Sequence, residues 1–119
     1  MFSVKVEGHF SSAHNLRGYK GKCEALHGHN WKVQVVAVAD ELDTTGMVMD
    51  FTVVKAALKK VLEPLDHTYL NNIPYFKKAN PTSERIAQYI FSRLKPAIAG
   101  LHSVTVWESE NASATYHEK

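Results

Sequence analysis

The sequence predicts an α+β domain whose helices cover one face of an antiparallel sheet. Two segments with alternating apolar residues come first, two with helical apolar spacing follow, and two more alternating segments end the chain. Neighbouring strands tend to pair, and neighbouring helices tend to share a face. We therefore expect the order ββααββ, with a four-stranded sheet and two helices, in a single domain spanning residues 1–119.

The composition fits a folded domain and excludes several other classes of protein. Hydrophobic residues make up 45% and charged residues 22% of the chain, unlike a disordered or collagen-like sequence. No apolar run approaches the roughly 20 residues of a transmembrane helix, and the first ten residues lack a secretory-signal pattern. A net charge of +2 with scattered lysines is too weak for nucleic acid binding. The single cysteine favours a reducing compartment, the cytoplasm.

The first part of the chain predicts two strands separated by a loop. Apolar residues alternate strictly over residues 2–10, as in a half-buried strand. Residues 15–28 are rich in glycine, lysine and arginine, so we expect a loop there. Residues 29–39 alternate again, and the polar stretch 40–46 ends this second strand.

The middle of the chain predicts two helices. Asp50 is a suitable N-cap for the first, whose apolar stripe continues until Pro64 ends it. Residues 66–80 are polar and predict another loop. The second helix is expected to begin at Pro81, with Asn80 as its N-cap, although Thr82 is an alternative cap.

The end of the chain predicts two more strands, over residues 102–109 and 112–118, joined by a turn. A sheet of this size has two open edges. Because open edges are often covered by a neighbouring subunit, we expect a homo-oligomer.

Histidine stands out in the composition, with seven in 119 residues. His27 and His29 are two residues apart, so they point the same way on an extended segment. His14 lies at the end of the first strand and comes beside them if the two strands form a hairpin. Three neutral imidazoles with a fourth position free are typical of a catalytic zinc site. The alternative is that they are ordinary surface or core histidines without a metal.

Cys23 precedes His27 by four residues, which brings a thiol near the predicted metal. A divalent cation and histidines lower the pKa of a nearby thiol, so a thiolate is available near neutral pH as a proton-abstracting base. Two other interpretations stay open at this point. The cysteine could be inert and buried, or it could be a fourth zinc ligand that closes the site.

Two further groups are candidates for chemistry. Asp66 can orient the adjacent His67 and favour its protonated form, although a turn aspartate beside a solvated histidine fits equally well. Glu108 shares a strand face with valines, where a carboxylate is costly to bury without a partner. A ligand with two adjacent N–H donors would pair with it, and so would an arginine or lysine of the protein.

Six motifs, taken together, resemble a known family. They are FSSAHNL, CEALHGHNW, GMVMDF, LDHTYLN, NPTSERIA and VWES. In this order they resemble the 6-pyruvoyltetrahydropterin synthase family from Phe2 to Tyr116, nearly the whole chain. The three-residue gap between Cys23 and His27 is similar to the bacterial 6-carboxy-5,6,7,8-tetrahydropterin synthase branch, whereas animal-type enzymes usually have five residues there. A third branch has glutamate in place of the cysteine; counting back from His27 reaches Cys23 rather than Glu24.

The resemblance implies an architecture and a metal. The architecture is the tunnelling fold, in which three subunits close a twelve-stranded barrel and two trimers stack into a homohexamer. The metal is Zn²⁺, bound by His14, His27 and His29.

The resemblance also implies catalytic and binding roles. Cys23 would be the base, and Asp66 with His67 would complete a proton relay that reaches the site from a neighbouring subunit. Glu108 would anchor the 2-amino-4-oxo edge of a pterin. Further pterin contacts are expected from Thr82, Ser83 and Glu84.

The substrate implied for this branch is 7,8-dihydroneopterin triphosphate, in the biosynthesis of queuosine and other deazapurines. Zinc would acidify C–H bonds of the side chain, triphosphate would leave, and a retro-aldol-like cleavage would release acetaldehyde. One alternative is a 6-pyruvoyltetrahydropterin synthase, which stops after triphosphate elimination. Another is a non-catalytic zinc- or pterin-binding protein on the same fold.

Overall fold

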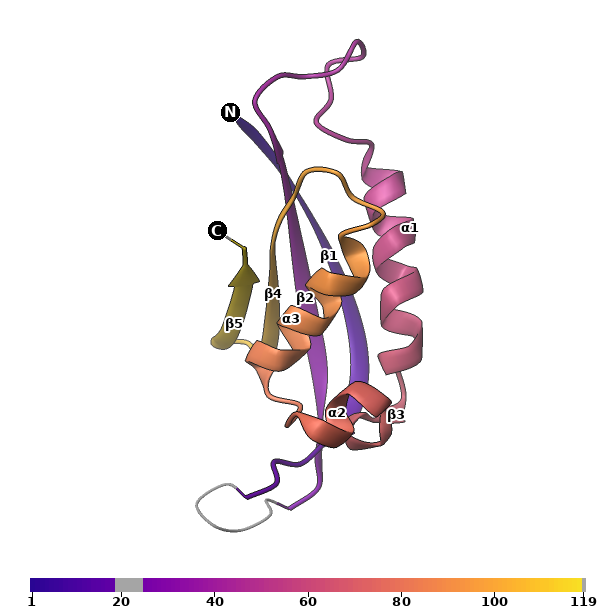
Figure 1. Ribbon diagram of the computed structural model, residues 1–119, viewed down its shortest axis with the longest axis vertical. Helices are drawn as coiled ribbons and strands as arrows, with labels where there is room; N and C mark the ends of the chain where they lie inside the picture. Colours follow the sequence, from indigo (N-terminus) through magenta and orange to yellow (C-terminus); the bar gives the residue numbers. More distant parts are fainter. Residues whose placement is uncertain (19–24, 119) are drawn as a thin grey trace.

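The computed structural model describes residues 1–18 and 25–118. Its strands, helices and 3₁₀ turns (η) are, in chain order, β1 (Phe2–His14), β2 (His27–Ala39), α1 (Phe51–Leu62), η1 (Glu63–Leu65), β3 (Thr68–Tyr69), η2 (Leu70–Asn72), α2 (Pro74–Lys78), α3 (Ser83–Leu94), β4 (Leu101–Ser109) and β5 (Ala112–His117). The strands form one sheet in the order β3-β1-β2-β4-β5 (Figure 1). All neighbours are antiparallel except β3, which is parallel to β1. The predicted α+β class is confirmed.

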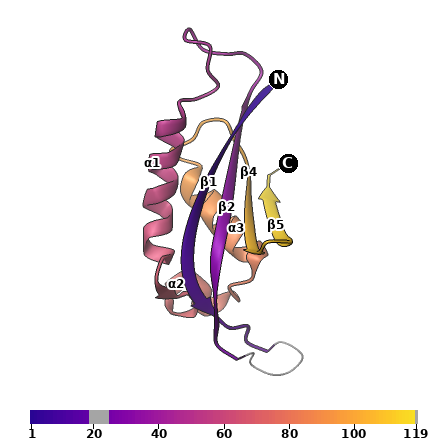
Figure 2. The same ribbon diagram turned by 180° about the vertical axis from the view of Figure 1, so that it is seen from behind.

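Both long helices cover the same face of the sheet, as Figures 1 and 2 show from opposite sides. α1 begins after Asp50, whose carboxylate accepts a hydrogen bond from the Thr52 N–H at 2.8 Å, so the predicted N-cap is confirmed. Its buried stripe (Val54, Leu58 and Leu62) and six buried residues of α3 belong to the hydrophobic core. In the described part of the chain, no helix is long and apolar enough to cross a membrane.

Every second residue of the central strands belongs to the face that the helices cover. The buried apolar residues of this face are Val6 and Phe10 on β1, Trp31, Val33, Val35 and Ala37 on β2, and Val104 and Val106 on β4. Continuing the same alternation to one end of the sheet reaches His14, His29 and Glu108. The core face of the sheet therefore changes from apolar to polar at that end.

The segment over residues 66–80 differs from the prediction, because it is not a loop throughout. It contains β3, η2 and α2, and β3 gives the sheet five strands rather than four. β3 is only two residues long and pairs with Ser12 and Ala13, which is too short to produce a periodic pattern. Buried Leu70 and Phe76 attach this segment to the core.

The strands of the first hairpin extend beyond the segments with alternating apolar residues. β1 continues past residue 10 to His14, the predicted end of this strand, whereas β2 starts at His27, inside the expected loop. The β1–β2 ladder extends as far as the pair His14 and His27. Polar side chains at these positions hid the alternation that marks the rest of each strand.

The second long helix starts later than predicted. α3 begins at Ser83 rather than Pro81, and Thr82 is its N-cap, with its side chain accepting a hydrogen bond from the Arg85 N–H at 3.1 Å. Asn80 is not the cap. Its side chain bonds instead to the backbone of another segment, which is described below.

Candidate metal and substrate site

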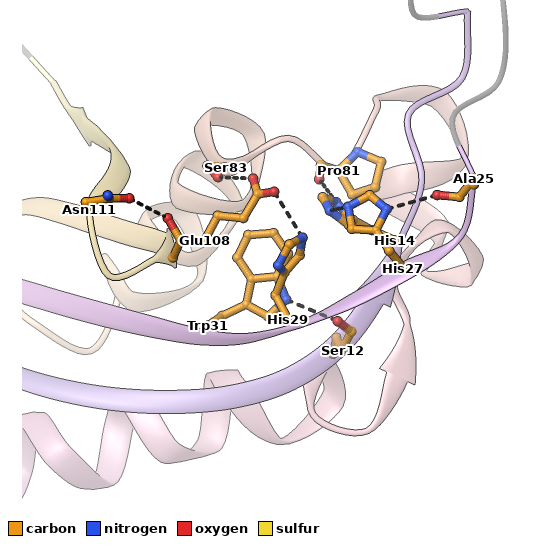
Figure 3. Close-up of polar contacts among 11 residues, drawn as sticks. Ser12, His14, Ala25, His27, His29, Trp31, Pro81, Ser83, Glu108 and Asn111 are labelled. Atoms are coloured by element: carbon orange, nitrogen blue, oxygen red, sulfur yellow. Dashed lines mark hydrogen bonds and ion pairs between the residues drawn. The ribbon is translucent and has the colours of Figure 1, made fainter.

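Three histidines from two neighbouring strands meet at the polar end of the core face (Figure 3). His14 is paired with His27 in the β1–β2 ladder, and His29 follows two residues later on the same side of β2. Their ring centroids are 4.6 Å (His14–His27), 4.7 Å (His27–His29) and 5.2 Å (His14–His29) apart. The hairpin thus brings together the three residues that the sequence singled out as metal ligands.

Backbone carbonyls determine which ring nitrogen of two histidines carries the proton. Nδ1 of His14 lies 2.8 Å from the carbonyl oxygen of Pro81, and Nδ1 of His27 lies 2.9 Å from that of Ala25. A carbonyl oxygen only accepts hydrogen bonds, so both Nδ1 atoms carry the hydrogen and both Nε2 atoms present a lone pair. This arrangement is typical of metal-binding histidines.

The spacing of these nitrogens fits a tetrahedral metal ion. The Nε2 atoms of His14 and His27 lie 3.1 Å apart. Two lone pairs at that distance repel each other unless a cation lies between them. Zinc–nitrogen bonds of about 2.0–2.1 Å in a tetrahedral site separate the nitrogens by about 3.3 Å. The donor set and its spacing therefore suit Zn²⁺.

Glu108 joins the histidines from β4. Its Oε1 lies 3.0 Å from Nε2 of His29, and its Oε2 accepts a hydrogen bond from the Ser83 hydroxyl at 3.3 Å. One ligand atom from each histidine and one carboxylate oxygen all lie within 4.8 Å of one another. No local sequence pattern predicts that Glu108 contacts His29, because this contact depends on how β2 and β4 pair.

The cluster opens into a pocket of about 340 Å³. Its lining residues are His14, Leu16, His27, Thr82, Ser83, Glu84 and Glu108. The structure thus brings the predicted segment Thr82–Glu84 to the histidines. The Thr82 hydroxyl caps α3, whereas the Ser83 hydroxyl reaches Glu108. The positive end of the helix dipole at this point favours a negatively charged group in the pocket.

Trp31 supports the histidines from the core side. Its ring is fully buried and stacks on Phe10 with centroids 5.8 Å apart. It also forms T-shaped pairs with the rings of His14 and His29, with centroid distances of 4.9 Å and 5.1 Å. Its Nε1 donates to the carbonyl of Ser12 at 3.3 Å.

The Asp66–His67 pair lies elsewhere, along the outer edge of β1. Asp66 Oδ1 accepts a hydrogen bond from the Ser11 N–H at 2.8 Å, and its Oδ2 lies 3.0 Å from Nδ1 of His67. The Ser11 N–H above all, and then the His67 ring, hold the pKa of the Asp66 carboxyl below its ordinary value. The His67 side chain is 83% exposed. Among the described residues of one chain, the pair makes no contact with the histidine cluster.

Cys23, the predicted base, and its neighbour Glu24 lie outside the residues that the structure describes. The described chain stops at Gly18 and resumes at Ala25. The other histidines are not part of the cluster. His102 and His117 are exposed and stack on each other with centroids 6.3 Å apart.

Comparisons with known proteins agree with the resemblance seen in the sequence. The family model described as 6-pyruvoyl tetrahydropterin synthase matches residues 3–119. The chain is 43% identical to the 6-carboxy-5,6,7,8-tetrahydropterin synthase of Synechocystis, covering 98% of this chain and 93% of that protein. It is 38% identical to the human 6-pyruvoyl tetrahydrobiopterin synthase, covering 89% of this chain and 77% of that protein. The 6-pyruvoyl tetrahydropterin synthase structure from Caenorhabditis elegans superposes with a TM-score of 0.87 at 28% identity, covering 99% and 96%.

The histidine cluster predicts that one divalent metal ion binds per chain. Replacing His14 or His29 by alanine removes a ligand, whereas losing an outer-sphere partner already weakens metal binding by up to about 100-fold. We therefore expect Zn²⁺ binding to weaken by more than about 100-fold. Competition with a chelator measures this affinity. His102→Ala removes an exposed histidine outside the cluster and should leave the affinity unchanged. Equal zinc affinity in all the variants would rule out the metal site.

The hydrogen bonds to Asp66 predict a contribution to stability that depends on pH. Because its pKa is lower in the folded protein, ionised Asp66 stabilises the fold above the ordinary value of 3.8, and this effect disappears as the pH falls through the lowered pKa. Asp66→Asn should therefore lower the melting temperature at neutral pH, and the difference should shrink below pH 3.8. Thermal melts across this range measure it. Asp40→Asn, which changes an exposed aspartate, is the control. If Asp66→Asn has the same Tm as wild type at neutral pH, the prediction is wrong.

Proposed function

The chain belongs to the 6-pyruvoyl tetrahydropterin synthase family, and we propose that it is a zinc-dependent lyase of the 6-carboxytetrahydropterin synthase type. It would convert 7,8-dihydroneopterin triphosphate and one water into 6-carboxy-5,6,7,8-tetrahydropterin, acetaldehyde and triphosphate. The observation that carries this proposal is the cluster of His14, His27 and His29 with Glu108, which adjoins a pocket of suitable size. A small pterin ring fits about 340 Å³, which lies within the usual range of ligand pockets.

The chain's own residues supply most of the required functions. Bound Zn²⁺ would act as a Lewis acid on the hydroxyls of the substrate side chain. His14 and His27 present Nε2 lone pairs because carbonyls hold their Nδ1 protons. Glu108 would accept two hydrogen bonds from the 2-amino-4-oxo edge of the pterin, and Ser83 holds one oxygen of this carboxylate. Cys23 would remove the proton from the substrate carbon.

We assign Asp66 and His67 to the active site of a neighbouring copy. In one chain they lie along the edge of β1, where only Ser12 and Ala13 pair with β3. β5 forms the opposite edge of the sheet. Two such edges allow the sheet to continue from copy to copy, which supports a homo-oligomer, by the resemblance a hexamer of two stacked trimers.

The choice between two product types rests on the spacing of Cys23. Its three-residue gap to His27 and the 43% identity to a carboxytetrahydropterin synthase favour carbon–carbon cleavage. The 38% identity to the human enzyme supports the second candidate, a pyruvoyl enzyme that eliminates triphosphate and keeps all side-chain carbons.

Product analysis tests the proposed reaction. Zinc-loaded protein given 7,8-dihydroneopterin triphosphate should release triphosphate and acetaldehyde and form a carboxylated tetrahydropterin, identified by mass spectrometry. Cys23→Ala should lower turnover by about 10²–10⁴-fold, the usual range for a general base, with unchanged zinc content.

Each other outcome of this experiment has a distinct meaning. Triphosphate release without acetaldehyde would identify the pyruvoyl-type reaction. Zinc binding without any turnover would indicate a binding protein. Full activity of Cys23→Ala would show that the cysteine is not the base.

Glu108 is close enough to be either a pterin anchor or a metal ligand, and its substitution separates the two roles. If Glu108 is a pterin anchor, Glu108→Gln should raise KM about 10- to 100-fold, since hydrogen bonds to a charged group contribute about 1.5–3 kcal/mol. Zinc content should not change. Loss of zinc instead would identify Glu108 as a ligand, and the exposed Glu110→Gln controls for charge.

A further inference from the structure

Two asparagines hold the segment that follows His14. β1 ends at His14, and within the described residues 15–18 the chain belongs to no strand. Asn71 nevertheless bonds both backbone groups of Asn15: Oδ1 accepts from the N–H at 3.0 Å, and Nδ2 donates to the carbonyl at 2.8 Å. Asn80 bonds Arg17 in the same way, with both distances 2.9 Å. We call Asn71 and Asn80 the asparagine clamp.

Each half of the clamp replaces a residue pair of a β ladder. In an antiparallel ladder, a hydrogen-bonded pair exchanges two N–H···O bonds, and here one side-chain amide makes both. Asn15 and Arg17 are two residues apart, and the clamp bonds the backbone groups of both. Every second residue is bonded in this way to a neighbour along the edge of a strand. Asn71 is only 6% exposed, and its removal would take away the hydrogen bonds that it makes to both backbone groups of Asn15.

The clamp connects β1 to the segment that leads into α3. The Arg17 guanidinium adds hydrogen bonds to the carbonyls of Phe76 and Ala79. The residue after Asn80 is Pro81, whose carbonyl oxygen accepts from Nδ1 of His14 at 2.8 Å. Asn80 is therefore one residue from the group that determines the tautomer of a proposed metal ligand.

We propose that Asn80, supported by Asn71, is a positioning residue of the metal site. It fixes the Pro81 carbonyl against His14, which keeps the hydrogen on Nδ1 and the lone pair on Nε2. Without the clamp, His14 also adopts the other tautomer, in which Nε2 carries the hydrogen and cannot bind a metal. The metal in this inference rests on the proposed function, whereas the effect of Asn80 on the His14 tautomer does not depend on it.

Zinc affinity and the His14 tautomer test the clamp together. Asn80→Ala should weaken Zn²⁺ binding about 10- to 100-fold, the effect of losing an outer-sphere partner. Asn80→Asp keeps the acceptor and loses the donor, so its affinity should lie between those of Asn80→Ala and wild type. In metal-free protein labelled with ¹⁵N-histidine, NMR at about pH 9, well above the ordinary imidazole pKa of about 6.5, should show Nδ1–H for wild-type His14 and a mixture for Asn80→Ala.

Matched controls separate positioning from a general loss of stability. Asn72→Ala replaces an exposed asparagine next to the clamp and should change neither measurement. Ile98→Val trims a buried side chain outside the pocket lining and should lower Tm without changing zinc affinity.

The possible failures are distinguishable. If wild-type protein binds no zinc, the proposed function fails, while the NMR comparison still decides the clamp. If Asn80→Ala melts at a lower temperature but keeps the wild-type tautomer, the clamp is only structural and the inference is overturned. A wild-type His14 without a hydrogen on Nδ1 would also overturn it.

Discussion

The pairing of β1 with β2 is the constraint on which the site depends. In a sheet, a shift of one residue turns every side chain of a strand to the opposite face. The register that pairs Phe10 with Trp31 on the core face also pairs His14 with His27 at its polar end. Packing of the two aromatic rings favours this register, since a one-residue slip of either strand would turn its ring away from the core face. The apolar core thereby sets the positions of the metal ligands.

The polar end of the core face is stable only if its polar atoms have partners, because unpaired buried polar groups are costly. Carbonyls of Pro81 and Ala25 take the Nδ1 hydrogens of His14 and His27. The facing Nε2 atoms of this pair, 3.1 Å apart, would then repel each other without a cation. The same contacts that orient the rings thus make a cation favourable at their centre, which links metal binding to folding.

Periodicity and local motifs predicted much of this structure. The alternating strands, the Asp50 cap and the His-x-His spacing are encoded within a few residues of the chain, and the structure bears out the strands and the cap. The contact of Glu108 with His29 and that of Asn80 with Arg17 join residues far apart in the sequence, the latter 63 positions apart. Such pairs leave no periodic signal, so the sequence predicted Asn80 as a helix cap.

The proposed function divides the chemistry between copies of the chain. One chain gathers three imidazoles and a carboxylate in one cluster, yet the described lining of the adjoining pocket contains no lysine or arginine to face a triphosphate. Its Asp66–His67 pair lies along the edge of β1, apart from that pocket. An edge that pairs with another copy would carry this pair toward that copy's pocket. Metal binding would then be a property of the single fold, whereas proton transfer would depend on assembly.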